Sequence, residues 1–136
     1  MQKAAFSLVK YYFDKINIDL KNHVTNDILL GFTTSGTYIK NDSTYELVFS
    51  VNGYNEGNED NPYIQIQCVS LFKFENVNSI EEIPDYFYRN SIAILFPFVR
   101  AYVNIITTQA SIPGVMLPLL NLTSLESILK ESTVEK

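Results

Sequence analysis

The longest apolar stretch of the chain covers residues 91–101 and continues with helical spacing to about Thr108. A stripe at helical spacing contains Ile94, Phe98, Ala101 and Ile105, and the remaining positions leave almost no polar face. A helix that is apolar all round must be covered on every side, and one small sheet covers only one side. The pattern therefore predicts either a second subunit against this helix or an exposed apolar patch of the kind that marks interaction surfaces.

A proline, Pro97, lies in the middle of this helical pattern. Proline removes one backbone hydrogen bond and its ring clashes with the preceding turn. The sequence thus predicts either a kink at Pro97 or a second helix that begins there.

Strand-like alternation of apolar and polar positions precedes the helix. It predicts strands over residues 6–20, 28–40, 45–52 and 63–74. The third strand is the clearest, with Tyr45, Leu47, Phe49 and Val51 on one face, and the fourth places Ile64, Ile66 and Cys68 on one face. Irregularities are expected at residues 11–13, which break the alternation, and at Gly36, where a bulge fits. Short polar connections predict an antiparallel sheet with meander or Greek-key-like order.

The C-terminal half reads as mostly helical. Residues 79–110 are expected to be helical, and residues 111–120 extended, because Pro113 and Pro118 each bias the preceding residue away from helix. A short helix is expected over residues 122–130, followed by a frayed tail over 131–136. The chain of 136 residues fits a single α+β domain, 1–136, with a four-stranded sheet in residues 6–74, a long kinked helix and a short C-terminal helix.

Composition narrows the possible partners. The net charge of −5 gives no electrostatic attraction to nucleic acid or to anionic membranes. The long apolar run is interrupted by polar residues and proline, and the first residues lack a signal-like apolar core, so we expect a cytoplasmic protein without membrane insertion.

The sequence offers few candidate catalytic or metal-ligating residues. The single cysteine, Cys68, and the single histidine, His23, lie far apart in the sequence and fall short of a metal-ligand set. The acidic loop over residues 56–60 lacks the ligand order of a calcium site. We therefore expect no catalytic residues, no metal and no cofactor, and Cys68 is interpreted as a buried apolar residue.

The sequence Ile94-Leu95-Phe96-Pro97-Phe98-Val99-Arg100 resembles the SecB export-chaperone family, which typically has Ile-Leu-Phe-Pro-Tyr, a small residue and Arg. Downstream, Ile112-Pro113 stands where the family has Phe-Pro, and Asn121-Leu122 where it has the Asn-Phe that opens its last helix. Together with the order of the strands, the resemblance covers about residues 6–130.

The resemblance implies a subunit that assembles into homodimers and homotetramers and holds unfolded polypeptides or preproteins, without ATP, for export. It implies that client segments bind in an apolar groove formed by Phe98, Tyr102, Ile112, Pro113, Val115, Met116 and Leu117. The simpler alternative is that these residues pack in the core or in a subunit interface. For docking to the SecA translocase, Asp19 matches one of the family's acidic positions, whereas Lys15 and Gln65 stand where acids are expected, which weakens this expectation.

Two classes of function stay open. The first is a SecB-like holdase for many non-native polypeptides. The alternative is an adaptor of the same fold dedicated to one partner, such as a toxin–antitoxin or phage protein. An enzyme is a third possibility, but no nucleophile–base pair, phosphate loop or metal cluster supports it.

Overall fold

The computed structural model describes residues 3–118 and 122–136. In chain order the elements are β1 (Ala5–Ile18), η1 (Leu20–Asn22), β2 (Leu29–Ile39), β3 (Thr44–Tyr54), β4 (Ile64–Glu75), η2 (Ile80–Glu82), α1 (Asp85–Gln109), α2 (Leu122–Ser132) and β5 (Val134–Glu135). The η elements are single turns of 3-10 helix. The fold is α+β, as the sequence predicted. Of the segment expected to be extended, residues 113–118 are neither helix nor strand, while residues 119 and 120 lie outside the described residues, as does Asn121.

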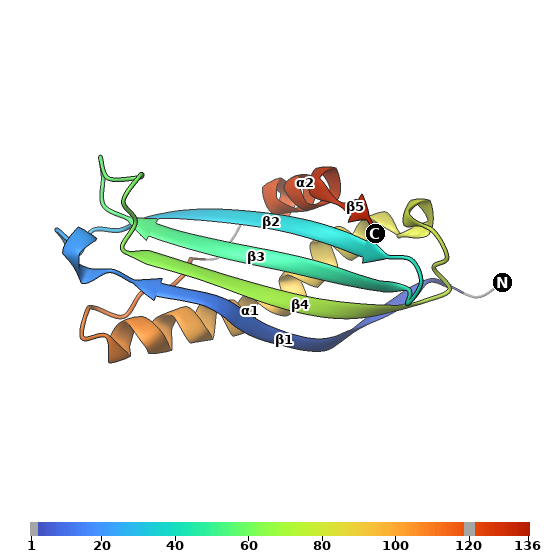
Figure 1. The fold of residues 1–136 in the computed structure, drawn as a ribbon, viewed down its shortest axis with the longest axis horizontal. Helices are drawn as coiled ribbons and strands as arrows, with labels where there is room; N and C mark the ends of the chain where they lie inside the picture. Colours follow the sequence, from blue (N-terminus) through green and yellow to red (C-terminus); the bar gives the residue numbers. More distant parts are fainter. Residues whose placement is uncertain (1–2, 119–121) are drawn as a thin grey trace.

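The strands form one sheet in the order β1-β4-β3-β2-β5 (Figure 1). Strands β2, β3 and β4 are consecutive antiparallel neighbours, and β1 returns to pair with β4 rather than with β2. The sequence predicts either a meander or a Greek-key-like order, and the sheet has the Greek-key order. Two register shifts in β1, between Leu8 and Lys10 and between Phe13 and Lys15, flank the irregular stretch expected at residues 11–13.

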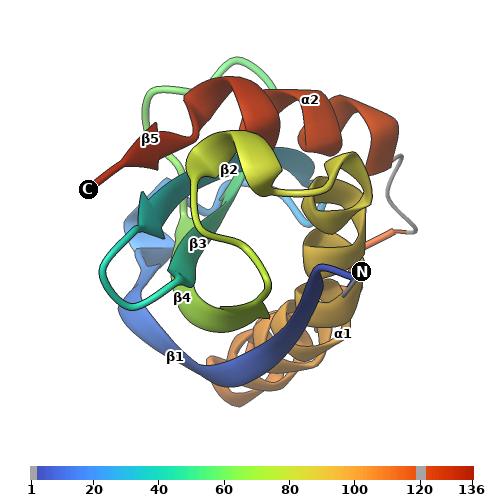
Figure 2. The same ribbon diagram turned by 90° about the vertical axis from the view of Figure 1, so that its right-hand side faces the viewer.

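The buried face of the sheet follows the predicted alternation. In β3, the four residues Tyr45, Leu47, Phe49 and Val51 are fully buried, and in β4 the residues Ile64, Ile66, Cys68, Phe72 and Phe74 are buried. In the end-on view of Figure 2, the curved sheet lies on one side of this core, α1 lies opposite it, and α2 closes the core beside β2. Both helices therefore cover the same face of the sheet.

Phe87, in the first turns of α1, is the centre of an aromatic cluster in this core. Its ring centroid lies 4.7 Å from that of Tyr45, 4.8 Å from those of Phe6 and Phe74, and 5.6 Å from that of Phe72. Most of these pairs have the edge-to-face geometry that aromatic rings prefer. One side chain thus joins α1 to β1, β3 and β4.

The helix α1 continues through Pro97 as one element of 25 residues. A proline at this position leaves the carbonyl group of Ala93 without its helical partner. Ala93 and Pro97 are both exposed, so water can solvate the carbonyl group there. The alternative of a second helix beginning at Pro97 is not observed.

The bulge expected at Gly36 is absent. Gly36 pairs with Leu47 in an unbroken β2–β3 register. A Cβ atom at this position would overlap the ring and hydroxyl of Tyr45, which is fully buried. Gly36 is therefore required by the close approach of Tyr45, and not by a change in strand register.

Replacing Gly36 by alanine is expected to destabilise the fold by about 1–3 kcal/mol, because the Tyr45 ring must shift within a packed core. Gly31→Ala in the same strand is the matched control, since no atom lies within 4 Å of a Cβ placed there. Urea unfolding of both variants measures the difference. Equal stability of the two variants would contradict this account.

The tail over residues 131–136, expected to fray, instead ends α2 and forms β5. The N–H of Lys136 donates to the carbonyl of Tyr38 at 2.8 Å, and the N–H of Lys40 donates to the carbonyl of Lys136 at 3.3 Å. The hydroxyl groups of Tyr45 and Thr133 are also hydrogen-bonded, at 2.6 Å. The physical reason is that the edge of β2 presents unpaired backbone groups, and the short parallel strand satisfies part of them.

Candidate functional site

The helix α1 divides into a buried and an open face. Its inner residues Ile92, Leu95, Val99 and Val103 are fully buried against the core. Its outer residues Ala93, Ile94, Pro97, Phe98, Ala101 and Ile105 are exposed, and Ile105 retains 58% of its accessible surface. We call the set Ile94, Phe98, Ala101 and Ile105 the outer stripe. The length and composition of α1 would also suffice for a membrane span, but its inner face forms the core of this domain.

Phe98 and Tyr102 lie on the side of α1 that faces β1. The ring of Phe98 stacks on Tyr11 with centroids 4.6 Å apart, and the ring of Tyr102 stacks on Phe13 at 3.9 Å. Phe98 is 41% exposed and Tyr102 is half-buried. Both side chains therefore fasten β1 to the helix while keeping part of their surface accessible.

The segment after α1 folds back along the helix, and its side chains alternate in burial. Leu117 is fully buried and Val115 nearly so, Ile112 is half-buried, and Pro113 and Met116 are exposed. The N–H of Val115 donates to Oγ1 of Thr107 at 2.9 Å, and its carbonyl accepts from Nδ2 of Asn104 at 3.4 Å. The predicted groove residues are thus separated: Leu117 belongs to the core, whereas Met116 faces outward.

A hollow with a volume of about 430 Å³ lies between α1 and this segment. We call it the α1 hollow, and it is lined by Phe96, Pro97, Arg100, Ala101, Asn104 and Met116. A smaller pocket of about 120 Å³ lies on the other side of the segment, where residues 112–116 meet His23, Asn26, Ile28 and Tyr63. Of the residues predicted from sequence, Met116 lines both pockets, whereas Ile112, Pro113 and Val115 line only the smaller one.

The site residues predicted from the sequence do not include Phe96, Arg100 or Asn104. The available signal was a cation and an amide at helical spacing, three and seven residues after Pro97, within an otherwise apolar run. In the structure, Nε of Arg100 is buried and has no hydrogen-bond partner. The ion pairs found among the described residues do not include this guanidinium.

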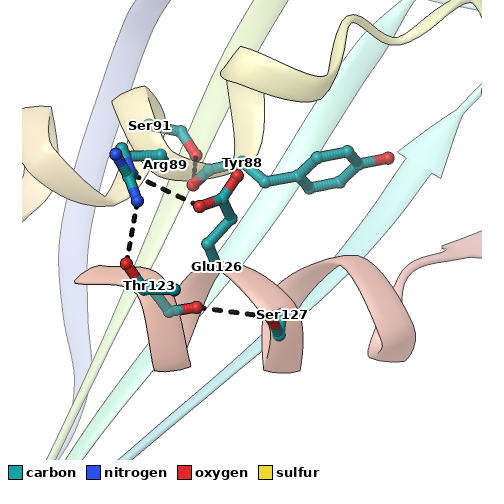
Figure 3. Close-up of polar contacts among 6 residues, drawn as sticks. All are labelled: Tyr88, Arg89, Ser91, Thr123, Glu126 and Ser127. Carbon is teal, nitrogen blue, oxygen red and sulfur yellow. Dashed lines mark hydrogen bonds and ion pairs between the residues drawn. The ribbon is translucent and has the colours of Figure 1, made fainter. Parts of the chain in front are cut away.

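The other arginine of the chain, Arg89, is paired. Figure 3 shows its guanidinium reaching from α1 to α2, where it contacts Glu126 at 3.3 Å and donates to Oγ1 of Thr123 at 2.9 Å. These contacts, with the ion pair of Lys130 and Asp85, hold α2 against the first half of α1. Arg89 therefore has a structural role, which leaves Arg100 as the arginine that faces a pocket.

Asp19, the position matched to translocase docking, is a helix cap. Its carboxylate accepts the N–H of Lys21 at 3.1 Å, and its own N–H donates to the carbonyl of Tyr63 at 2.9 Å. Lys15 and Gln65 line a shallow polar pocket on the open face of the sheet. The side chain of Gln65 there accepts a hydrogen bond from Asn17.

The remaining reactive groups are placed as follows. Cys68 is fully buried, and burial, with a smaller effect of the Asp14 charge, raises the pKa of its thiol to about 12. His23 packs edge-on against Tyr63 with ring centroids 4.8 Å apart. Within the described ranges 3–118 and 122–136, no group of three or more metal-ligating side chains is found.

Taken together, the fold and this surface define an α+β domain whose long helix keeps one apolar face open, the kind of surface at which proteins contact other polypeptides. The chain belongs to the SecB family. The family model described as preprotein translocase subunit SecB matches residues 15–128, which confirms the resemblance drawn from the sequence.

Two further comparisons bear on the fold. A SecB-like chaperone of Mycobacterium tuberculosis, Rv1957, solved in complex with a ChAD peptide from the Rv1956 HigA1 antitoxin, superposes with a TM-score of 0.53 at 18% identity, covering 88% of this chain and 91% of that one. The uncharacterized protein MJ0357 of Methanocaldococcus jannaschii is 33% identical over 75 residues, which span 52% of this chain and 48% of that relative. The chain thus matches about half the length of its archaeal relative.

Proposed function

We propose that this chain is a SecB-like holdase that binds non-native polypeptides without ATP. The observation that carries the proposal is the open apolar surface of α1, formed by the outer stripe and the α1 hollow, in a member of the SecB family. An apolar surface of this kind binds unfolded segments because they expose apolar side chains that folded proteins bury. Met116, which is 62% exposed at the rim of the hollow, has a flexible thioether that adapts to clients of different shape.

We also propose that the two parts of this surface have different partners. Ile94, Phe98 and Ile105 of the outer stripe are contacted by a second copy of the chain, within a homodimer or homotetramer, and the α1 hollow, which Ala101 also lines, is left for the client. The stripe is entirely apolar, as the buried cores of subunit contacts tend to be, whereas the hollow contains a charge and an amide. Together they explain why α1 carries almost no polar face.

A specific observation favours a second candidate function. The chaperone from M. tuberculosis with this fold was solved with a peptide from one antitoxin, so the fold is compatible with a dedicated partner. In this alternative the chain is an adaptor for one protein, for example of a toxin–antitoxin pair or a phage. Pull-down with the purified chain separates the two: recovery of one protein favours the adaptor, and recovery of many unrelated unfolded proteins favours the holdase.

For the cell, we propose a cytoplasmic protein that works before any export step. Docking to SecA is not part of the proposal. The carboxylate of Asp19 caps a turn of helix, and Lys15 and Gln65 stand where the resemblance implies acids.

The holdase proposal predicts that the chain suppresses the aggregation of an unfolded client. Chemically denatured malate dehydrogenase, diluted into buffer, is expected to scatter light less as the chain is added, with full suppression near stoichiometric amounts. Added ATP is expected to have no effect. Scattering that is unchanged at a tenfold excess of the chain would contradict the holdase and leave the adaptor.

A further inference from the structure

The segment that follows α1 has a defined register along this helix. We call residues 112–118, which fold back along α1, the strap. Val115 and Leu117 are buried and Met116, between them, is exposed. Successive side chains of an extended chain point in opposite directions, so a shift of the strap by one residue would exchange the buried and the exposed sets. The side chains that the strap offers to a client therefore depend on its register.

Both backbone groups of Val115 are held by side chains of α1. Its N–H donates to Oγ1 of Thr107 at 2.9 Å, and its carbonyl accepts from Nδ2 of Asn104 at 3.4 Å. Thr107 is fully buried, and its own hydroxyl donates to the carbonyl of Val103 at 2.7 Å, which leaves the oxygen free to accept from the strap. Because Val115 is also buried, its N–H would lack a partner if the strap left this position, which is unfavourable.

Gly114 selects the same register because it has no side chain. A Cβ atom at this position would lie 2.6 Å from Oγ1 of Thr108 and 3.1 Å from Nδ2 of Asn104. A shift of one residue in either direction would bring Pro113 or Val115 into this gap, and each of them carries a Cβ atom. The hydrogen bonds to α1 and the narrow gap thus specify one register independently.

We propose that Asn104, Thr107 and Gly114 are positioning residues, which fix the register of the strap and so decide which of its side chains face a bound client. This rests on the proposed function, because it assigns the exposed side of the strap to a bound polypeptide. In the observed register Met116 lines both the α1 hollow and the smaller pocket on the other side of the strap. A strap that is already fixed loses less conformational freedom when the client binds, which favours binding.

Single cysteines placed in the strap measure its register. Met116→Cys is expected to react with a maleimide about a hundredfold faster than Val115→Cys, because residue 116 is 62% exposed and residue 115 only 8%. Cys68 is fully buried, so the chain without an added cysteine gives a slow background rate. Thr107→Val, which removes the hydroxyl at nearly constant volume, is expected to lower the ratio of the two rates to about tenfold, and Thr107→Ser to keep it.

The matched control is Thr34→Val, which removes another buried hydroxyl, one that donates from β2 to the carbonyl of Leu125 at 3.3 Å. It is expected to keep the wild-type ratio. Gly114→Ala is a second, independent variant and is expected to lower the ratio, because the added Cβ atom fills the gap beside Thr108. A ratio lowered equally by Thr34→Val, or kept by both Thr107→Val and Gly114→Ala, would overturn the proposal.

The effect on the client is measured by anisotropy titration of a fluorescent peptide, Ser-Val-Thr-Leu-Gln-Phe-Thr-Val-Ser. Thr107→Val is expected to bind it about fivefold more weakly than the wild-type chain, as the loss of one hydrogen bond allows. Thr107→Ser and Thr34→Val are expected to keep the wild-type affinity. A lowered ratio of thiol rates with unchanged peptide affinity would overturn the positioning role but keep the proposed function. A wild-type chain that neither binds the peptide nor suppresses the aggregation of malate dehydrogenase would contradict both.

Discussion

Phe87→Ala is expected to lower the free energy of unfolding by about 3–5 kcal/mol, the usual cost of truncating a buried phenylalanine. Phe87 is fully buried, and its ring contacts aromatic rings from three strands. Its removal leaves a cavity that the surrounding rings cannot fill without giving up their edge-to-face contacts. Because domains of this kind are stable by only about 5–15 kcal/mol, the variant is expected to be close to unfolding at physiological temperature.

Urea unfolding, followed by circular dichroism at one fixed chain concentration, measures this loss. Phe87→Leu keeps most of the apolar volume and is expected to lose about 1 kcal/mol. Tyr86→Ala, next in sequence but 51% exposed, is the surface control. A Phe87→Ala variant as stable as Tyr86→Ala would show that the aromatic cluster does not hold the helix to the sheet.

The sequence predicted which face of the third and fourth strands is buried, but in the first strand Ile16, expected on the buried face, is 48% exposed. It did not predict which strands are neighbours. Alternation assigned Tyr45 and Ile64 to the core correctly, because the period of a strand fixes the direction of each side chain. Alternation contains no information on which strands pair, so it leaves the pairing of β1 with β4 open. The tail was missed for a related reason: a strand of two residues is too short to show a period, and its stability comes from the unpaired edge of β2.

Gly36 is a second position at which the sequence leaves two structures open. A glycine within a strand predicts either a bulge or a close approach, and only the position of Tyr45 across the β2–β3 pair decides between them.

The candidate site was predicted in part. The sequence located the long helix that is apolar on nearly all sides and the extended segment after it. The predicted groove, however, combines residues that the structure separates. In an extended segment, neighbouring side chains point in opposite directions, so Val115 and Leu117 face the core whereas Met116 faces the α1 hollow. In the sequence, Arg100 belongs to a family motif and interrupts the apolar run. Its unpaired state depends on what packs around it, which the sequence pattern does not contain.

If the outer stripe of α1 contacts a second copy of the chain, charges placed on this stripe are expected to weaken assembly. Ile94 and Ile105 lie at the two ends of the outer stripe and are 39% and 58% exposed. Replacing both by glutamate leaves the core unchanged but places charges where a second copy is expected to pack, and charges buried without partners oppose association. We expect light scattering to report a mass of four copies, or of two, for the wild-type chain and a smaller assembly for the double variant, with unchanged circular dichroism.

The matched control is Thr33→Glu with Ser35→Glu, which adds the same two charges at exposed positions of β2 on the open face of the sheet. Because its net charge equals that of the stripe variant, it separates a local effect at α1 from general repulsion between copies. The control is expected to keep the wild-type mass. A wild-type chain that is monomeric at micromolar concentration would contradict the assignment of the stripe to a second copy. A stripe variant with the wild-type mass would contradict it as well, and would leave the whole open face of α1 to the client.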